Sequence, residues 1–94
     1  MKEHELKTDP DVFDAVVRGE KKFEIRFNDR DFCVGDLLIL RKTRYTGEEM
    51  KNGKPLEYVN GYFACYVTYI LHGAIYGLKE GWVIMSIQPR DGAG

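Results

Sequence analysis

The sequence lacks the long apolar segment that a membrane-spanning helix requires, because no run of about 18 apolar residues occurs in it. Its first ten residues, MKEHELKTDP, are polar and lack the apolar core of a signal peptide. Cysteine is scarce, with Cys33 and Cys65 far apart, so we expect reduced thiols in a cytoplasmic protein and no disulfide framework. With 94 residues, the chain is expected to form one domain over residues 1–94.

An excess of charge of one sign is also missing, because 14 Lys and Arg residues face 15 Asp and Glu residues. This balance excludes a polybasic binder, so any nucleic-acid site must be a local patch. The spacings typical of zinc ligands, phosphate-binding loops, nucleophile elbows and dinucleotide-binding turns are absent from the sequence. We therefore expect no metal, no cofactor and no membrane partner.

What is present is a well-patterned globular chain, with 44% apolar and 13% aromatic residues. Residues 8–10 (TDP) combine a capping side chain with proline at the first helical position, and Gly19 is suited to end a helix. The spacing predicts a helix over residues 10–18, with four apolar residues on its buried face. These four are Val12, Phe13, Val16 and Val17.

Alternating or β-branched segments predict strands at residues 3–8, 21–27, 37–40, 62–71 and 82–87. In the second of these, alternation places Phe23, Ile25 and Phe27 on the core face. Residues 43–61 are predicted to form a long excursion, a β-arm that turns at Asn52-Gly53.

The strands and the helix do not alternate as βαβ units, so a doubly wound parallel sheet is disfavoured. The expected fold class is α+β and mostly β: a small mixed β-barrel of five to six strands with one N-terminal helix packed against it. Residues 89–94 are expected to form a flexible tail.

The segment GEKKFEIR, at residues 19–26, concentrates the chemistry of the chain. Gly19 ends the helix, Lys21 enters the strand, and Glu24 and Arg26 share one strand face. Such a cluster can hold a planar polar ligand through bidentate contacts, or it can do acid–base work. It can also simply pair across strands and stabilise the sheet by about 0.2–1 kcal/mol, and spacing alone favours that role.

This segment resembles the GxKxxExR signature of the ASCH superfamily, which is named for activating-signal-cointegrator homology and is similar to the PUA domains of RNA-modifying enzymes. Gly19, Lys21, Glu24 and Arg26 all match the signature. Other segments resemble one small bacterial and phage branch, so the resemblance covers nearly the whole chain. These segments are HELK at 4–7, FEIRFNDRDF at 23–32, VGDLLIL at 34–40, VTYIL at 67–71 and GLKEGWVIMSI at 77–87.

The resemblance implies a PUA-like barrel in which the four motif residues line a cleft between barrel and helix. It implies RNA or a modified nucleobase as the ligand. It also implies an alternative, because some members resemble this chain and hydrolyse N4-acetylcytidine, while others are ribonucleases. On that alternative Lys21 and Glu24 are catalytic. The amidohydrolases have a threonine where this chain has Glu24, which favours binding over catalysis.

Residues 18–44 hold eight Lys and Arg against five Asp and Glu, a bias that suits a phosphate-attracting surface or simply a solvated face. His4 either donates a hydrogen bond to a phosphate or acts as a general base, or it is a surface histidine without a functional role. Tyr76, in a glycine-flanked loop, is the candidate for base stacking. A ligand-free interaction protein, with an unknown protein partner, remains a third hypothesis. The full set of candidate ligand-binding residues is His4, Lys7, Gly19, Lys21, Glu24, Arg26, Asn28, Arg30 and Tyr76.

Overall fold

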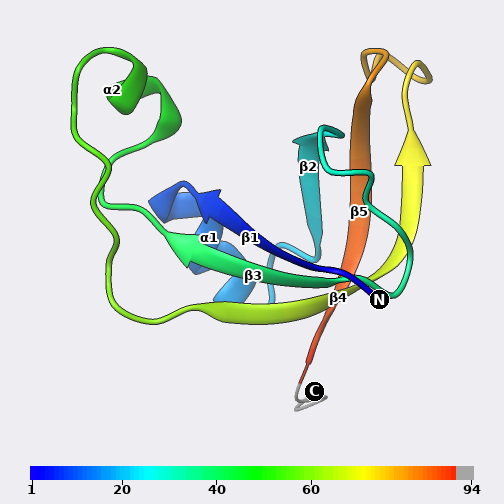
Figure 1. Cartoon of the computed structure of the whole chain (residues 1–94), viewed down its shortest axis with the longest axis horizontal. Coiled ribbons are helices and arrows are strands. Elements are labelled where there is room, and N and C mark those ends of the chain that lie inside the picture. Colours follow the sequence, from blue (N-terminus) through cyan, green and yellow to red (C-terminus); the bar gives the residue numbers. More distant parts are fainter. Residues whose placement is uncertain (91–94) are drawn as a thin grey trace.

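A computed structural model describes residues 1–90 and contains five strands and two helices (Figure 1). In chain order the elements are β1 (Glu3–Thr8), α1 (Pro10–Val17), β2 (Phe23–Phe27), β3 (Leu37–Lys42), α2 (Gly47–Lys51), β4 (Phe63–His72) and β5 (Trp82–Pro89). The predicted tail overlaps the end of β5, and its residues 91–94 lie outside the described residues. Across residues 1–90, neither helix has the length and apolar character that a bilayer crossing demands.

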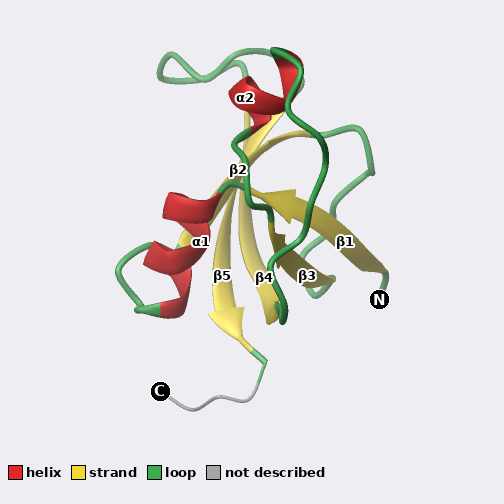
Figure 2. Ribbon diagram, turned by 90° about the vertical axis from the view of Figure 1, so that its left-hand side faces the viewer, coloured by secondary structure: helices red, strands yellow, loops and turns green. Residues whose placement is uncertain are grey.

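The strands form one curled sheet in the order β1-β3-β4-β5-β2. β1 runs parallel to β3, and all other neighbours are antiparallel. The curl makes a half-barrel whose two edge strands are β1 and β2 (Figures 1 and 2). Apolar side chains fill the concave side, including Leu38, Leu40 and Met85 from the strands. The expectation of a small, mostly β fold of the α+β class with a curled sheet is therefore confirmed.

Helix α1 packs on the concave side through Phe13 and Val16, which lie three residues apart and belong to the core. Val12 and Val17 are exposed, so the predicted four-residue apolar face is too wide for this two-turn helix. The predicted side-chain cap is also wrong. Asp9 occupies the capping position, but its Oδ1 accepts a hydrogen bond from the Gly47 amide at 2.9 Å instead.

The two faces of β2 are the reverse of the prediction. Glu24 is buried, with 2% of its surface exposed, whereas Phe23, Ile25 and Phe27 are between 43% and 53% exposed. The register agrees, because Glu24 lies opposite Met85, a core residue of β5. The physical reason is that Glu24 finds cationic partners inside the half-barrel, as described below.

The excursion at residues 43–61 contains a short helix, so the predicted β-arm is wrong. Thr46 and Glu49 form a capping box, in which each side chain accepts a hydrogen bond from the other's backbone amide. Asn52 is the C-terminal cap and Gly53 follows with φ of +110°, so Asn52-Gly53 ends this helix rather than turning a hairpin.

The reversed faces of β2 predict unequal costs of truncation. Met85→Ala removes a fully buried side chain and is expected to lower the free energy of unfolding by about 2–5 kcal/mol. Ile25→Ala acts on the outer face and is expected to lower it by roughly 1 kcal/mol or less. Urea denaturation followed by circular dichroism measures both values. A larger loss for Ile25→Ala than for Met85→Ala would contradict the assignment of the faces.

Candidate functional site

The gap between the edge strands β1 and β2, which we call the seam, is bridged by arginine side chains. Arg26 Nη1 donates to the Lys7 carbonyl at 2.9 Å, and Arg30 Nη1 donates to the Glu5 carbonyl at 2.8 Å. Each guanidinium therefore occupies the place where the amide of a neighbouring strand would donate to β1. The seam is closed by side chains rather than by a strand ladder.

Glu24 is the centre of a buried ion-pair cluster behind the seam. Its Oε2 accepts from Lys21 Nζ at 2.7 Å, and its Oε1 accepts from Arg26 Nη2 at 2.7 Å and Nε at 3.1 Å. The Lys21 and Arg26 side chains are only 14% and 23% exposed. A buried carboxylate is tolerated when it is paired and hydrogen-bonded, so these two cations explain why Glu24 faces the core.

Further contacts fix both cations in place. Arg26 Nη2 also donates to Thr8 Oγ1 at 3.2 Å, in addition to the bond with the Lys7 carbonyl. Lys21 Nζ also donates to the Phe23 carbonyl and lies 4.7 Å from the centroid of the Phe23 ring. Close by, burial and secondarily the charge of Glu24 raise the pKa of the Cys65 thiol to about 12. Cys65 is thus an inert core thiol.

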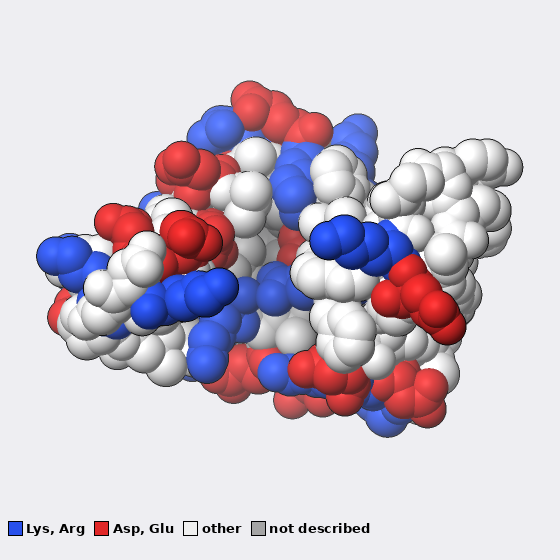
Figure 3. Space-filling view, turned by 90° about the horizontal axis from the view of Figure 1, so that it is seen from above, with Lys and Arg blue, Asp and Glu red and all other residues white. Residues whose placement is uncertain are grey.

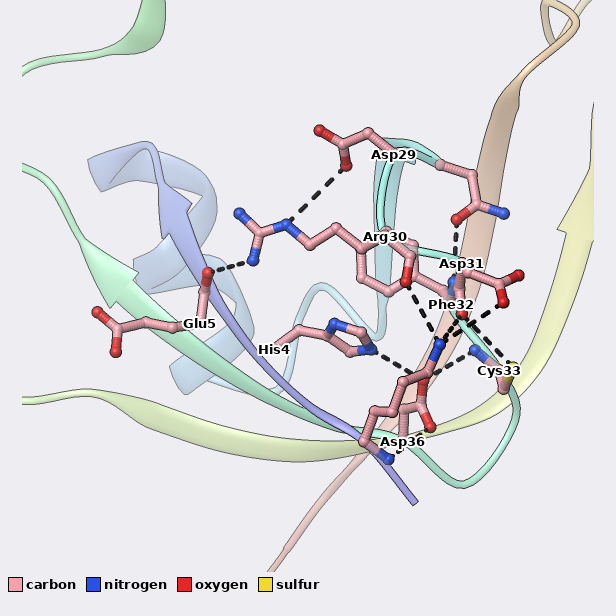
Figure 4. Close-up of polar contacts among 10 residues, drawn as sticks. His4, Glu5, Asp29, Arg30, Asp31, Phe32, Cys33 and Asp36 are labelled. Atoms are coloured by element: carbon pink, nitrogen blue, oxygen red, sulfur yellow. Dashed lines mark hydrogen bonds and ion pairs between the residues drawn. The ribbon is translucent and has the colours of Figure 1, made fainter.

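A second network ties the segment between β2 and β3 to β1 (Figure 4). The buried carboxylate of Asp36 accepts from the amides of Lys2 at 3.0 Å and Cys33 at 2.9 Å, and it lies 2.9 Å from His4 Nε2. Burial acts to raise the pKa of Asp36, but the hydrogen bonds from His4 and the two amides outweigh it and hold the pKa at about 2. This segment therefore has a fixed position beside the seam.

His4 is buried, so the reading of it as a surface histidine is wrong. Its ring packs against Phe32 with centroids 4.8 Å apart, and its Nε2 contacts Asp36, so it positions the segment after β2. Asn28 has a similar role, because its Oδ1 accepts from the Phe32 amide at 2.9 Å.

Between the two networks lies a cavity of about 330 Å³ at the seam, which we call the seam cavity. It combines three aromatic rings, two guanidinium groups and one carboxylate. Phe27 and Trp82 meet edge to face with centroids 6.0 Å apart, and Arg30 reaches from the segment after β2 towards β1 (Figure 4). Its lining residues are Leu6, Ile25, Arg26, Phe27, Asp29, Arg30, Phe32 and Trp82.

A second cavity, of about 630 Å³, lies between the C-terminal end of α1 and the ends of β4 and β5. Gly19 and Lys21 line it together with the cations Arg18 and Lys22. Gly19 has φ of +78°, a conformation that favours glycine where the chain leaves α1. The predicted single cleft is therefore divided: Lys21 borders this cavity, Arg26 borders the seam cavity, and Glu24 lies buried between them.

Two further candidates, Lys7 and Tyr76, are not among the residues that line the two cavities. Lys7 places its backbone carbonyl in the seam, where Arg26 binds it. Tyr76 lies in the turn between β4 and β5, is 90% exposed and lines neither cavity. Sequence reasoning missed the aromatic wall of Phe27, Phe32 and Trp82. Phe27 and Trp82 lie in strands, where aromatic residues usually indicate core packing, and Phe32 lies in the segment after β2.

The face of the molecule seen from above in Figure 3 is hollowed between the region of α2 and the ends of β2 and β5. Lys and Arg side chains gather at the centre of this hollow, and acidic side chains lie around it. Cationic side chains are therefore concentrated locally on this face, with acidic side chains around them.

The chain belongs to the family described as a domain of unknown function, DUF3850, whose model matches residues 3–87. The match extends from β1 into β5 and so includes the motif, the seam and both networks apart from Lys2. No curated protein matches the sequence.

The low pKa of Asp36 predicts a specific loss of stability in acid. Because its pKa is about 2 in the folded chain and 3.8 in an unperturbed carboxyl, ionised Asp36 stabilises the fold above about pH 4. This contribution is lost as the pH falls from about 4 towards 2. Asp36→Asn is expected to lower the free energy of unfolding at pH 7 by about 1.5–3 kcal/mol. It is also expected to reduce the acid limb, which is the fall in the free energy of unfolding between about pH 4 and pH 2. Urea unfolding from pH 2 to 7 measures both effects.

The matched control is Asp31→Asn, which alters an exposed carboxylate of the same segment and should leave the acid limb unchanged. If Asp36→Asn lost stability in acid as steeply as the wild type, the acid-dependent stability would not come from Asp36.

The cluster around Glu24 predicts that its charge supports the fold. Glu24→Gln leaves Lys21 and Arg26 without their buried counter-charge and is expected to cost about 3–5 kcal/mol. Glu20→Gln breaks the exposed pair with Arg18 and is expected to change stability little. Chemical denaturation of the two variants compares them directly. If both variants lost only a little free energy of unfolding, the Glu24 cluster would not stabilise the fold.

Proposed function

We propose that this chain is a PUA-like module of the ASCH type that binds RNA or a modified nucleobase, and that one base enters the seam cavity. The observation that carries the proposal is the composition of that cavity, where aromatic rings and guanidinium groups share one opening. Its volume of about 330 Å³ lies at the lower end of the range of about 300–1,000 Å³ typical of small-molecule sites.

The aromatic wall supports base stacking. Phe27 and Trp82 come from the adjacent strands β2 and β5, and Phe32 comes from the segment after β2. Because β2 turns Phe27 away from the core, this residue is 53% exposed, and Trp82 is 37% exposed, so both rings are accessible to a ligand. Phe32 is buried and belongs to the core, so it supports the wall from behind. Stacking of a base on an aromatic side chain contributes about 1–3 kcal/mol.

Arg30 supports phosphate or base-edge recognition. Among the contacts of residues 1–90, its guanidinium donates a single hydrogen bond, to the Glu5 carbonyl. The group has five N–H donors, so most of them are available to an incoming anion. Arg26, by contrast, donates its hydrogen bonds to Glu24, Lys7 and Thr8. We therefore assign ligand contact mainly to Arg30 and a positioning role to Arg26.

The alternative of a hydrolase, with Lys21 and Glu24 catalytic, gains less support. Both carboxylate oxygens of Glu24 accept hydrogen bonds from protein cations, and its side chain is buried. A general acid or base must come within hydrogen-bond reach of the substrate proton, which this arrangement does not favour. The contacts of Glu24 suit a structural carboxylate that orients two cations.

Trp82 is the single tryptophan of the chain and lines the seam cavity, so its fluorescence reports on occupancy. Short single-stranded RNAs and nucleosides, including N4-acetylcytidine, are expected to quench it saturably. RNA affinity should fall with added salt. Phe27→Leu and Arg30→Ala are each expected to weaken binding by about tenfold, in line with the loss of one stacking or one charge-assisted contact.

The control is Arg44→Ala, which removes an exposed arginine that lines neither cavity and should retain wild-type affinity. Analysis of the same samples for acetate or cleaved RNA distinguishes the hydrolase alternative. An absence of quenching by every RNA and nucleoside would overturn the proposal and favour an interaction protein.

A further inference from the structure

The seam cavity carries one carboxylate, Asp29, directly beside the guanidinium of Arg30 (Figure 4). Asp29 Oδ1 lies 3.9 Å from Arg30 Nε, which is an ion pair but longer than a hydrogen bond. The backbone that holds the pair is fixed, because the Asp29 amide donates to the Phe27 carbonyl at 2.9 Å and Asn28 caps the Phe32 amide. An acceptor and a donor group therefore lie side by side at a defined place on the cavity wall.

Both groups have spare hydrogen-bonding capacity. Within residues 1–90, the Asp29 carboxylate accepts no hydrogen bond, and it is exposed. Arg30 uses a single N–H on the Glu5 carbonyl. The pair can therefore receive a ligand that presents two donors next to an acceptor without breaking a hydrogen bond of the Asp29 carboxylate.

Guanine fits this pattern better than the other common bases. Its N1–H and N2–H donors can both reach one carboxylate, and its O6 and N7 acceptors suit a guanidinium. Adenine and cytosine each place an acceptor beside their exocyclic amine, and uracil places one N–H between two carbonyls. A carboxylate facing those edges meets at least one repelling acceptor.

We propose that Asp29 and Arg30 make the seam cavity selective for guanine. The inference rests on the proposed function, because it assigns a preference among bases to the cavity in which a base is proposed to stack. Asp29 accepts from the Watson–Crick edge of guanine, Arg30 donates to its O6, and the ring lies against the aromatic wall.

The test is a set of Trp82 fluorescence titrations with GMP, IMP, AMP, CMP and UMP at one salt concentration. All five carry the same phosphate, so differences report on the base. GMP is expected to bind about tenfold more tightly than AMP, CMP or UMP. IMP, which lacks the exocyclic N2 amine, should lie between GMP and the others.

Asp29→Asn is expected to weaken GMP binding about tenfold, to leave UMP binding within about twofold of wild type, and to abolish the difference between GMP and IMP. Asp31→Asn is the matched control, because it alters an exposed carboxylate that does not line the cavity and should keep the preference. Circular dichroism checks that both variants fold.

The outcomes separate the two proposals. Equal binding of all five nucleotides would overturn the selectivity, and the Phe27→Leu variant described above then decides whether the base stacks in the cavity. A guanine preference that survives in Asp29→Asn would overturn the role of Asp29. No binding of any nucleotide or of short RNA would overturn both proposals.

Discussion

The structure depends on one buried carboxylate. Glu24 lies inside a half-barrel whose other inward residues are largely apolar, and such a charge is tolerated only with close partners. Lys21 and Arg26, three residues before and two residues after it, provide them. Because side chains alternate along a strand, placing Glu24 inside forces Phe23, Ile25 and Phe27 outside. The buried charge of Glu24 therefore determines that the outer face of β2 carries aromatic and aliphatic side chains.

The same ion pair decides how the sheet is closed. An open sheet edge normally invites another strand, and this sheet has two such edges facing each other. Arg26, oriented by Glu24, reaches the carbonyl of Lys7 and so links the two edges. A side chain is longer than a backbone hydrogen bond, so this closure leaves room for a cavity that a complete ladder would fill.

Much of the fold follows from the sequence, because strand alternation, a proline at a helix start and glycine turns are local signals. The strands and α1 lie close to their predicted positions. The orientation of β2 does not follow, since the rule that charged residues face solvent fails where cations lie nearby in sequence and space. Helix α2 was encoded by its Thr46–Glu49 capping box, but the following Asn52-Gly53 resembles a hairpin signal.

The candidate site was predictable only in part, for a related reason. The motif residues are found by their spacing. Spacing cannot show, however, that Lys21 and Arg26 line two different cavities with Glu24 buried between them. That division depends on tertiary contacts with Lys7, Thr8 and the strand ends.

Arg26 and Arg30 differ in how firmly the fold holds them. Both bridge the seam to β1, but Arg26 is held by a buried carboxylate while Arg30 lies beside an exposed one. Displacing Arg26 would leave Glu24 short of a counter-charge in the core, which is costly. Displacing Arg30 costs one hydrogen bond at the surface. For the proposed base-binding function, Arg30 is therefore the guanidinium that a ligand displaces at the lower cost, which is why the proposal assigns recognition to the turn after β2 and positioning to Arg26.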